Sequence, residues 1–407
     1  MPAALSHITV LDLSRVLAGP WSGQTLADLG ADVIKIERPG VGDDTRAWGP
    51  PYLKDAAGND TRESAYFLSA NRGKKSLTVD ISQPEGQDII RRLAAQSDIL
   101  LENYKVGQLK KYGLDYASLR AVNPRLIYCS ITGFGQDGPD AQRAGYDFMI
   151  QGMGGLMSVT GAPDGVPGAG PVKVGVAVTD LMTGMYATVG VLAALAQRER
   201  SGVGQQIDIA LLDVQVAMLA NQASNYLVGG QVPGRLGNAH PNIVPYQAFA
   251  SADGHLILAV GNDRQFGAFC AVAGHAEWAA DERFASNAAR VRQRAALVAL
   301  IEPVLRTRAT RTWLAQLEQA GVPCGPINTL DQVFAEPQVR HRRLERRLPH
   351  ALVDALPTVA IPLRMSASTD AGVCAPPLLG QHTHEILRER LQLDAAGIEG
   401  LRARGVV

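Results

Sequence analysis

Short runs of apolar residues alternate with helix-like patterns through the first third of the chain. In the runs, hydrophobic side chains follow one another or alternate with polar ones, as in buried or half-buried strands. Between the runs, apolar residues recur every three or four positions, which predicts helices. We expect strands at residues 8–13, 31–37, 76–81, 98–103 and 125–134, and helices at 20–29 and 84–96. This alternation predicts an α/β fold with a mostly parallel sheet covered on both faces.

The pattern changes beyond residue 200. Residues 200–245 are rich in glycine and polar side chains, which predicts loops. Two apolar runs follow, 246–250 and 255–260, and the Asp253-Gly254 pair between them favours a tight turn. These two runs therefore predict a β-hairpin.

Helical patterns return after this hairpin. Amphipathic stretches at 291–307 and 312–321 predict two helices. Together with the hairpin, they indicate a smaller α+β domain over residues 222–325. The basic stretch at 340–347 predicts the solvated face of a helix, because the chain as a whole is electrically neutral.

Length and composition narrow the class of protein. A chain of 407 residues is long for one hydrophobic core, so two domains are expected. Hydrophobic residues make up 46% of the chain and charged residues 19%, which is typical of a soluble globular enzyme. The 39 basic and 39 acidic residues balance to a formal net charge of +0, which argues against a nucleic-acid-binding protein.

The cysteines and the apolar segments indicate in which cellular compartment the protein works. The four cysteines are widely spaced and form no C-x-x-C pair, which argues against a disulfide framework or a zinc site and fits the cytoplasm. The N-terminus has no basic region followed by an apolar run, so we expect no signal peptide. The most apolar long segment, residues 174–196, contains Asp180 and three glycines, which predicts a core helix rather than a membrane span.

The turn after the first predicted strand tests for a dinucleotide-binding Rossmann domain. Such a domain carries G-x-G-x-x-G there, whereas residues 14–23 read SRVLAGPWSG. Glu37 ends the second strand where a ribose-binding acid would lie. Arg38 follows it, and an arginine suits the phosphorylated ribose of NADP or coenzyme A. The basic stretch NRGKK at 71–75 is either a solvated loop or a clamp for phosphates.

Asp147 is the main candidate for catalysis. It stands beside an aromatic residue and just upstream of Gly152, Gly154 and Gly155, which we interpret as a flexible run. In a dry cleft with backbone N–H groups nearby, a carboxylate can attack an activated acyl group and form a covalent intermediate. An aspartate before glycines is also common in turns and helix caps, so the role of Asp147 depends on the other motifs of the chain.

Six stretches, taken in order, resemble class III CoA-transferases of the CaiB/BaiF type, the formyl-CoA transferase-like family. They are VLDLSRVLAGPWSGQTLADLGADVIKIERPGVGDDTR (10–46), NRGKKSLTVDI (71–81), DILLENYKVGQLKKYGLDY (98–116), SITGFGQDGP (130–139), GYD (145–147) and APPLLGQHTHEIL (375–387). The resemblance covers essentially the whole chain. It implies an interlocked homodimer whose Rossmann-like, CoA-binding large domain uses both chain ends. The expected large domain is 1–200 and 330–407, the small domain 222–325, and the linkers 201–221 and 326–329.

The resemblance also implies roles for single residues. An aspartate is the covalent nucleophile in this family, and the matching position is Asp147. The positions that match CoA-contacting residues are Leu17, Ala18, Arg38, Asn71, Lys74, Asn103, Tyr104 and Lys111. The lid and substrate positions are Gly237, Asn238, His240 and Asn242, with Gly154 and Gly155 of the glycine run. Backbone N–H groups of that run are expected to stabilise oxyanions. CoA and acyl-CoA are then substrates, and no permanent cofactor or metal is expected.

The middle of the chain bears on the substrate. Residues 237–249 and 253–266 are similar to enzymes that move CoA between succinate and glutarate-type dicarboxylates. This likeness implies succinyl-CoA as donor and a short dicarboxylic acid as acceptor. The second carboxylate of such an acid needs a cationic or donor-rich partner, for which the candidates are Arg15, Lys173, Arg235, His240 and Asn242.

Two other functions stay open. An α-methylacyl-CoA racemase of the same fold needs two acid/base groups on opposite faces of its substrate. In racemases of this family a histidine precedes the aspartate of the motif and a second aspartate precedes a glycine run. Here Tyr146 takes the histidine position, and Leu181 rather than glycine follows Asp180. The other alternative is a non-catalytic CoA-binding protein. Neither a nucleic-acid partner nor a membrane is expected.

Overall fold

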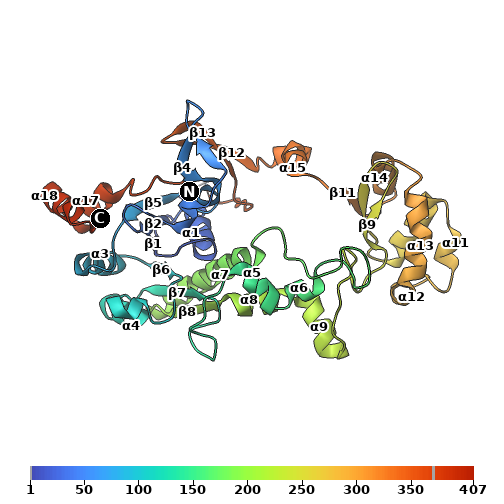
Figure 1. Cartoon of the computed structure of the whole chain (residues 1–407), viewed down its shortest axis with the longest axis horizontal. Coiled ribbons are helices and arrows are strands. Elements are labelled where there is room, and N and C mark those ends of the chain that lie inside the picture. The colour runs from blue at the N-terminus through green and yellow to red at the C-terminus, as the bar shows by residue number, and fades with distance from the viewer. Residues whose placement is uncertain (1, 369–371) are drawn as a thin grey trace. The chain divides into compact units, whose positions relative to one another are not determined.

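The computed structural model describes residues 2–368 and 372–407. These residues form two compact units (Figure 1), of which the first contains two hydrophobic cores and the second contains one. The first unit comprises residues 1–154, 175–218 and 338–407, so both ends of the chain contribute to it. The second comprises residues 155–174 and 219–337.

The first unit is built on a six-stranded parallel sheet, which confirms the predicted α/β class. The strand order is β5-β2-β1-β6-β7-β8. The five strands predicted from the sequence are all present, and β8 is an addition. The strands are β1 (Thr9–Asp12), β2 (Asp32–Glu37), β5 (Lys74–Thr78), β6 (Ile99–Glu102), β7 (Ile127–Thr132) and β8 (Gln206–Ala210).

Both faces of this sheet are buried, which explains why its strands read as nearly continuous apolar runs. Successive side chains point to opposite faces, so Leu11 and Leu100 join one core while Val10 and Ile99 join the other. The first core is closed by α3 (Pro84–Ala94), α4 (Tyr116–Val122), α17 (Thr383–Leu391) and α18 (Ala395–Ala403). The second is closed by α1 (Ala18–Asp28) and α7 (Val178–Ser201).

The helix α7 is long and apolar enough to cross a membrane by length and composition alone. In the structure it packs against α1, β7 and β8, and Ala187 and Val191 on it are fully buried in the core. It therefore has the place in the fold that the sequence predicted, that of a core helix.

Two sequence predictions about connecting segments are wrong. Residues 201–221 were expected to be a linker, but they contain β8 and α8 (Leu211–Met218), both in the first unit. Residues 340–347 were expected to be a helix face, but only Arg340 and His341 are helical, at the end of α16, and the chain becomes strand β12 at Glu345. From there, exposed and half-buried side chains alternate, because β12 (Glu345–His350) pairs with β13 (Val353–Val359) in a hairpin. That local strand pairing prevails over the helix propensity of the basic stretch.

The remaining elements of the first unit are short. They include a second hairpin, β3 (Tyr52–Lys54) with β4 (Asp60–Ser64), which the sequence analysis missed. The helices are η1 (Asp44–Ala47), α2 (Ala65–Ser69), η2 (Leu109–Tyr112) and α5 (Asp147–Met153), and α16 (Pro337–His341) spans the boundary between the units.

The second unit contains the predicted hairpin, β9 (Tyr246–Ala250) and β10 (His255–Ala259), which β11 (Cys324–Pro326) extends. Helices pack around this sheet on a core that includes Trp313 and Phe269. The unit also includes residues 155–174, which the sequence analysis placed in the large domain. Its helices are α6 (Leu156–Val159), α9 (Ala220–Gly229), α10 (Asp263–Ala273), α11 (Glu277–Ala280), α12 (Asn287–Arg292), α13 (Arg294–Leu305), α14 (Thr310–Gln319) and α15 (Leu330–Ala335).

Candidate active site

A cleft lies where the strand order of the large sheet reverses. The chain steps outward from β1 to β2 on one side, whereas β6 and β7 extend the sheet on the other side. Loops from adjacent strands diverge at such a switch point, so open α/β sheets bind their ligands there. The cleft has a volume of about 210 Å³. Its lining comes mainly from the loops after β1, β6 and β7 and includes Arg15, Leu17, Ala18, Asn103, Tyr104, Lys105, Gln108, Gly133, Arg143, Tyr146 and Asp180.

The loop after β1 has a strained backbone that long-range contacts hold in place. Val16 has a φ angle of 71°, in the left-handed region that a β-branched residue avoids. Its N–H donates to Asp43 Oδ1 at 3.2 Å. Asn103 binds both polar backbone groups of Arg15, accepting from its N–H at 2.9 Å and donating to its carbonyl at 2.7 Å. Asn103 therefore ties the loop after β1 to the loop after β6.

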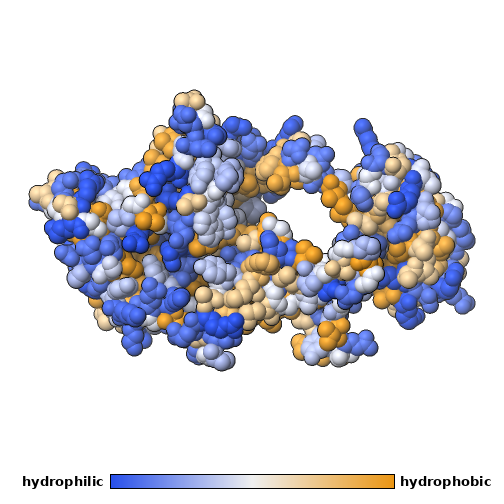
Figure 2. Space-filling view, in the orientation of Figure 1, coloured by the Kyte–Doolittle hydropathy of each residue, from blue (hydrophilic) through white to orange (hydrophobic). Residues whose placement is uncertain are grey.

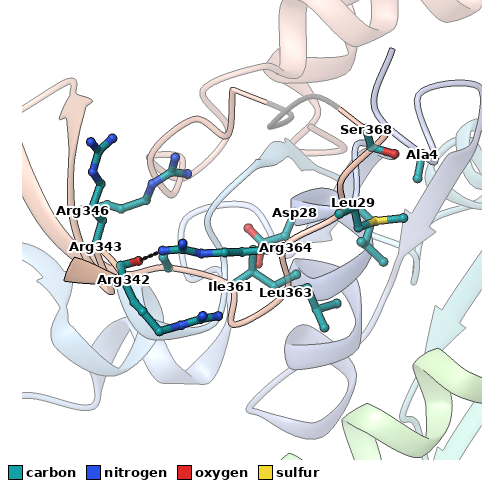
Figure 3. Close-up of a pocket in the computed structure, with 12 residues that line it drawn as sticks. Ala4, Asp28, Leu29, Arg342, Arg343, Arg346, Ile361, Leu363, Arg364 and Ser368 are labelled. Atoms are coloured by element: carbon teal, nitrogen blue, oxygen red, sulfur yellow. Dashed lines mark hydrogen bonds between the residues drawn. The ribbon is translucent and has the colours of Figure 1, made fainter. Parts of the chain in front are cut away.

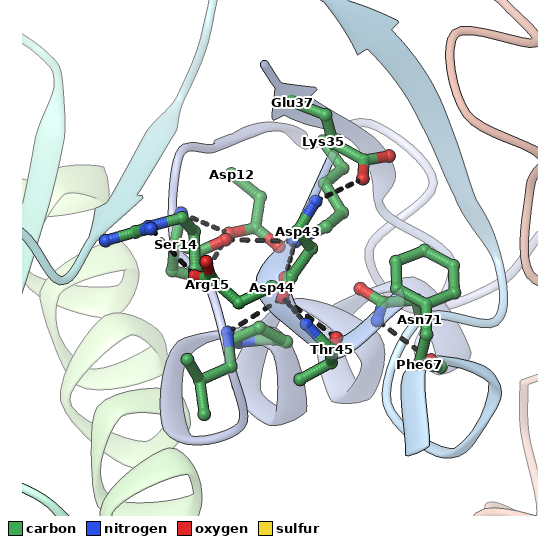
Figure 4. A network of polar contacts seen from close by, with 12 residues as sticks. Asp12, Ser14, Arg15, Lys35, Glu37, Asp43, Asp44, Thr45, Phe67 and Asn71 are labelled. Atoms are coloured by element: carbon green, nitrogen blue, oxygen red, sulfur yellow. Dashed lines mark hydrogen bonds and ion pairs between the residues drawn. The ribbon is translucent and has the colours of Figure 1, made fainter. Parts of the chain in front are cut away.

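Two buried ion pairs lie next to this loop, and Figure 4 shows the first of them, between Lys35 and Asp43. Lys35 Nζ lies 2.8 Å from Asp43 Oδ2 and 2.9 Å from the carbonyl oxygen of Ser14. Lys74 Nζ lies 2.8 Å from Asp12 Oδ2. All four charged side chains are 0% exposed. Burial alone would raise the pKa of Asp43, but the ammonium of Lys35, with hydrogen bonds from Lys35 and Thr45, lowers it to about 2.

The predicted contact of Asn71 and Lys74 with CoA is not supported. Lys74 donates to Asp12, to the carbonyl oxygen of Pro20 and to Asn71 Oδ1, so its three N–H bonds are all used inside the protein. Asn71 is 0% exposed and donates to the carbonyl oxygen of Phe67. Burial lowers the pKa of Lys74 to about 8, against the opposing effect of Asp12. Asn71 and Lys74 thus belong to an internal network rather than to a phosphate clamp.

Four other predicted CoA positions do line the cleft: Leu17, Ala18, Asn103 and Tyr104. The guanidinium of Arg15 lies 5.7 Å from the ring centroid of Tyr104. Arg38 and Lys111 are exposed and lie outside the lining. Their predicted contacts with the nucleotide end of CoA stay predictions.

Asp147 is half-buried and begins α5, directly after the cleft residue Tyr146. Gln151, one turn further along α5, donates from Nε2 to Asp147 Oδ2 at 2.6 Å. The backbone N–H groups of Thr179 and Asp180, in the first turn of α7, donate to Oδ1 at 2.8 and 3.3 Å. The positive end of a long helix therefore holds this carboxylate in one orientation.

The glycine run after Asp147 is not the flexible, donor-rich loop that the sequence suggested. Gly152 lies within α5, and the N–H of Gly154 donates to the carbonyl oxygen of Ile150 at 2.7 Å. A Cβ on Gly154 would lie 2.3 Å from Gln215 Cγ, so this glycine allows α8 to pack closely against α5. The N–H of Gly154 is therefore engaged within the helix, and an oxyanion role for the rest of the glycine run stays a prediction.

The partners of Asp147 were not predicted from the sequence. Gln151 lies four residues after Asp147, a spacing that puts two side chains on one helix face, so a periodicity test could have found it. Thr179 and Asp180 are more than 30 residues away, and only the packing of α5 against α7 brings them to the carboxylate. Thr179 Oγ1 also donates to Gln215 Oε1 at 2.6 Å, which anchors this turn to α8.

The other predicted site residues belong to the second unit, and their lid role stays a prediction. Gly237 pairs with Gly161 in an isolated β-bridge, and Asn238 Oδ1 accepts from the N–H of Ala248. His240 Nδ1 accepts from the N–H of Asn242 at 3.0 Å. In the same unit, Arg235 is paired with Asp164, Lys173 is exposed, and Gly155 precedes α6 with a φ angle of 86°.

The first unit has another cavity, of about 300 Å³, near the end of α1 (Figure 3). Arginine side chains from residues 342–346 and Arg364 line it together with apolar Ile361, Leu363 and Met365. Arg364 donates to the carbonyl oxygen of Arg342. This cavity shares no lining residue with the cleft at the switch point, so it is separate from the candidate active site.

Comparison with known proteins places the chain in a family. A family model described as CoA-transferase family III matches residues 5–383. The succinate–glutarate CoA-transferase of Agrobacterium fabrum is 51% identical over 385 residues, which cover 95% of each chain. The succinyl-CoA:glutarate CoA-transferase of Homo sapiens is 44% identical over 403 residues, which cover 99% of this chain and 90% of that one.

Solved structures agree with this match. The crystal structure of a CaiB/BaiF family protein from Brucella suis is 50% identical and superposes with a TM-score of 0.83, covering 96% of this chain and 100% of that one. The structure of Rv3272 from Mycobacterium tuberculosis is 32% identical, with a TM-score of 0.81 over 94% and 99% of the two chains. This protein, with its parallel sheet and its anchored aspartate beside the cleft, belongs to the class III CoA-transferase family.

Proposed function

We propose that this enzyme transfers CoA from succinyl-CoA to glutarate or a closely related short dicarboxylic acid, through a thioester on Asp147. The observation that carries the proposal is the anchoring of Asp147 beside the cleft, by Gln151 and by two N–H groups of α7. The choice of acids is supported by the names of similar proteins, which are succinate–glutarate CoA-transferases.

The proposed reaction proceeds through acyl transfers at Asp147. Its carboxylate attacks the thioester carbon of succinyl-CoA, the C–S bond breaks, and a mixed anhydride and CoA thiolate form. The thiolate attacks the carboxyl carbon of Asp147 and releases succinate, which leaves an aspartyl-CoA thioester. The carboxylate of glutarate attacks that thioester and again expels the thiolate. The thiolate then attacks the glutaryl carbon, which yields glutaryl-CoA and restores Asp147.

The contacts of Asp147 suit this sequence of steps. Oδ2, which bonds only to the side chain of Gln151, is the oxygen we assign to the attack on the acyl group. Oδ1 then becomes the carbonyl oxygen of each aspartyl intermediate and carries negative charge whenever its carbon is attacked. The N–H groups of Thr179 and Asp180 already point at Oδ1, and such preorganised donors stabilise an oxyanion without reorganisation.

The cleft offers surfaces for CoA, which is a substrate of this family rather than a fixed cofactor. We assign its walls at Leu17, Ala18, Asn103 and Tyr104 to the thiol-bearing arm and neighbouring parts of CoA. We assign the exposed Arg38 and Lys111 to its phosphates, because guanidinium and ammonium groups are the usual phosphate partners.

We further propose that the enzyme acts as an interlocked homodimer in the cytoplasm. The second unit exposes large apolar side chains around α9 and α15, visible as orange atoms in Figure 2. Leu227 is 78% exposed, Val228 89% and Leu330 78%. Apolar patches of this kind mark interaction surfaces. The proposed location rests on the four widely spaced cysteines of the sequence.

The function is tested by incubating the protein with succinyl-CoA and a panel of carboxylic acids, with mass spectrometry of the CoA products and of the intact protein. Glutaryl-CoA and a CoA-sized adduct on Asp147 are the expected products. Transfer to no acid, with exchange of an α-proton of a branched acyl-CoA for solvent deuterium, would favour a racemase instead. Binding of CoA without either reaction would favour a non-catalytic protein.

Arg15 is the cation that we assign to the distal carboxylate of glutarate. It lines the cleft, and its side chain is 47% exposed although it pairs with Asp44 at 2.7 Å. We expect Arg15→Met to raise the KM for glutarate by about 10- to 100-fold, because the substitution removes a charge-assisted hydrogen bond to the second carboxylate. The KM for pentanoate, which lacks the second carboxylate, is expected to stay within about threefold. An equal increase in KM for glutarate and for pentanoate would contradict this assignment.

A further inference from the structure

Asp180 is a second carboxyl group in the cleft, apart from the proposed nucleophile. It lies in the first turn of α7 and lines the cleft together with Leu17 and Ala18. Gly184, one turn later on the same helix face, is packed against the start of α1: a Cβ there would lie 2.6 Å from the carbonyl oxygen of Ala18. Because α7 packs closely against the start of α1, the face of α7 that carries Asp180 lies toward the loop after β1, which lines the cleft.

Asp180 is also a neighbour of Asp147. Its backbone N–H donates to Asp147 Oδ1 at 3.3 Å, next to the 2.8 Å bond from Thr179. Any acyl group attached to Asp147 is therefore built within a few ångströms of the first turn of α7. Asp180 also lines the cleft that we assign to the acyl-CoA.

The surroundings of Asp180 favour its neutral form. Burial, together with the negative charge of Asp147, raises the pKa of Asp180 to about 7. Burial and the charges of the same two aspartates raise the pKa of Tyr66 to about 12, so Tyr66 stays neutral beside them. Within the described part of the chain, the other titratable groups on the cleft or on elements packed against α7 are Arg15, Asp28, Tyr104, Lys105, Tyr128, Cys129, Arg143, Tyr146, Asp208 and Asp213. Arg15 and Arg143 are already paired with Asp44 and Asp140.

We propose that Asp180 is a catalytic residue, which in its protonated form donates a hydrogen bond to the carbonyl oxygen of the acyl group under attack by Asp147. The proposal rests on the proposed function, because it concerns the substrate side of the same acyl transfer. The proton stays on Asp180 throughout: no bond to it forms or breaks, and the only covalent changes are the new O–C bond to Asp147 and the broken C–S bond.

Charge explains why the neutral acid is required. When Asp147 attacks, the carbonyl oxygen of the substrate gains negative charge, and a neutral carboxylic acid can donate to it. An ionised Asp180 has no proton to donate and would repel that oxygen. The N–H groups of Thr179 and Asp180 bind the other oxygen, Asp147 Oδ1, so they do not supply this contact.

The test compares the wild type with Asp180→Asn, Asp180→Ala and a control, Asp213→Asn, which changes an exposed carboxylate on α8. Each protein is mixed with succinyl-CoA in single turnover from pH 5.5 to 8.5. The rate of CoA-adduct formation on Asp147 is followed by intact-protein mass spectrometry. Thermal unfolding and CoA binding show whether each variant is folded.

The expected rate for the wild type and for Asp213→Asn falls as pH rises through about 7, because the protonated form of Asp180 is the active one. Asp180→Asn keeps an N–H donor and cannot ionise. It is expected to retain the rate within about tenfold and to lose the fall near pH 7. Asp180→Ala is expected to be slower by about 100-fold or more at pH 6, the usual cost of a lost oxyanion donor.

Two results would overturn the assignment. One is an Asp180→Ala protein whose rate stays within about twofold of the wild type. The other is an Asp180→Asn protein that keeps the wild-type fall near pH 7, since another group would then cause it. A wild type that transfers CoA but never carries an adduct would instead refute the aspartyl mechanism, and the role of Asp180 with it.

Discussion

Asp147→Ala is expected to lower the rate of CoA transfer by at least about 10⁴-fold, while the protein stays folded and binds CoA nearly as well as the wild type. The size of the loss follows from the removal of a nucleophile, for which no other group can substitute. CoA binding is expected to persist because Asp147 is not among the residues that line the cleft.

The measurement is a steady-state assay with succinyl-CoA and glutarate, combined with calorimetry for CoA binding. Asp137→Asn is a matched control, since Asp137 is an exposed carboxylate ten residues earlier. It is expected to transfer CoA at the wild-type rate. If Asp147→Ala retains even a tenth of the activity, Asp147 is not the nucleophile.

Asp43→Ala is expected to lower the free energy of unfolding by about 3–5 kcal/mol, because it leaves the ammonium of Lys35 buried without its partner. The Lys35–Asp43 pair is 0% exposed on both sides. Asp43 also accepts from the N–H groups of Val16 and Thr45, so the loop after β1 loses a support at the same time. We therefore expect a KM for succinyl-CoA that rises by at least about tenfold.

Urea unfolding of the variant and the wild type measures the first effect, and initial rates measure the second. Asp44→Ala is the comparison: the neighbouring Asp44 pairs with Arg15 at the surface, where both side chains are nearly half exposed. Its removal is expected to cost less than about 1 kcal/mol. Similar losses of stability in the two variants would show that the buried network does not hold the loop.

The elements of the large sheet could be predicted because their signal is local. Strands such as Ile99–Glu102 are buried on both faces, so nearly every residue is apolar and the run stands out from its neighbours. The hairpin at 246–259 was found for a similar reason, since an Asp-Gly turn separates two apolar runs. In both cases the information lies within about ten consecutive residues.

Strands outside the middle of the large sheet carry a weaker signal in the sequence. Strand β8 reads QIDIA and pairs with the rest of the sheet on one side only, and the hairpin β12–β13 contains several charged residues and two prolines. Strand β8 was missed because it pairs with β7, more than 70 residues earlier in the chain, whereas β12 and β13 pair across a short turn but lack the apolar alternation that marks a strand. Tertiary contacts also place residues 155–174 in the second unit.

The sequence by itself determined the class of the fold, the family resemblance and Asp147 as the candidate nucleophile. Only the tertiary structure decided what surrounds that residue. Asn71 and Lys74 belong to a basic stretch, NRGKK, of a kind that suits phosphates. In the structure they are buried, and Lys74 donates to Asp12 and to Asn71. The anchors of Asp147 at Thr179 and Asp180 come from a helix start more than 30 residues away. The charge state and donors of a side chain depend on which groups lie within a few ångströms, and packing rather than sequence spacing sets those distances.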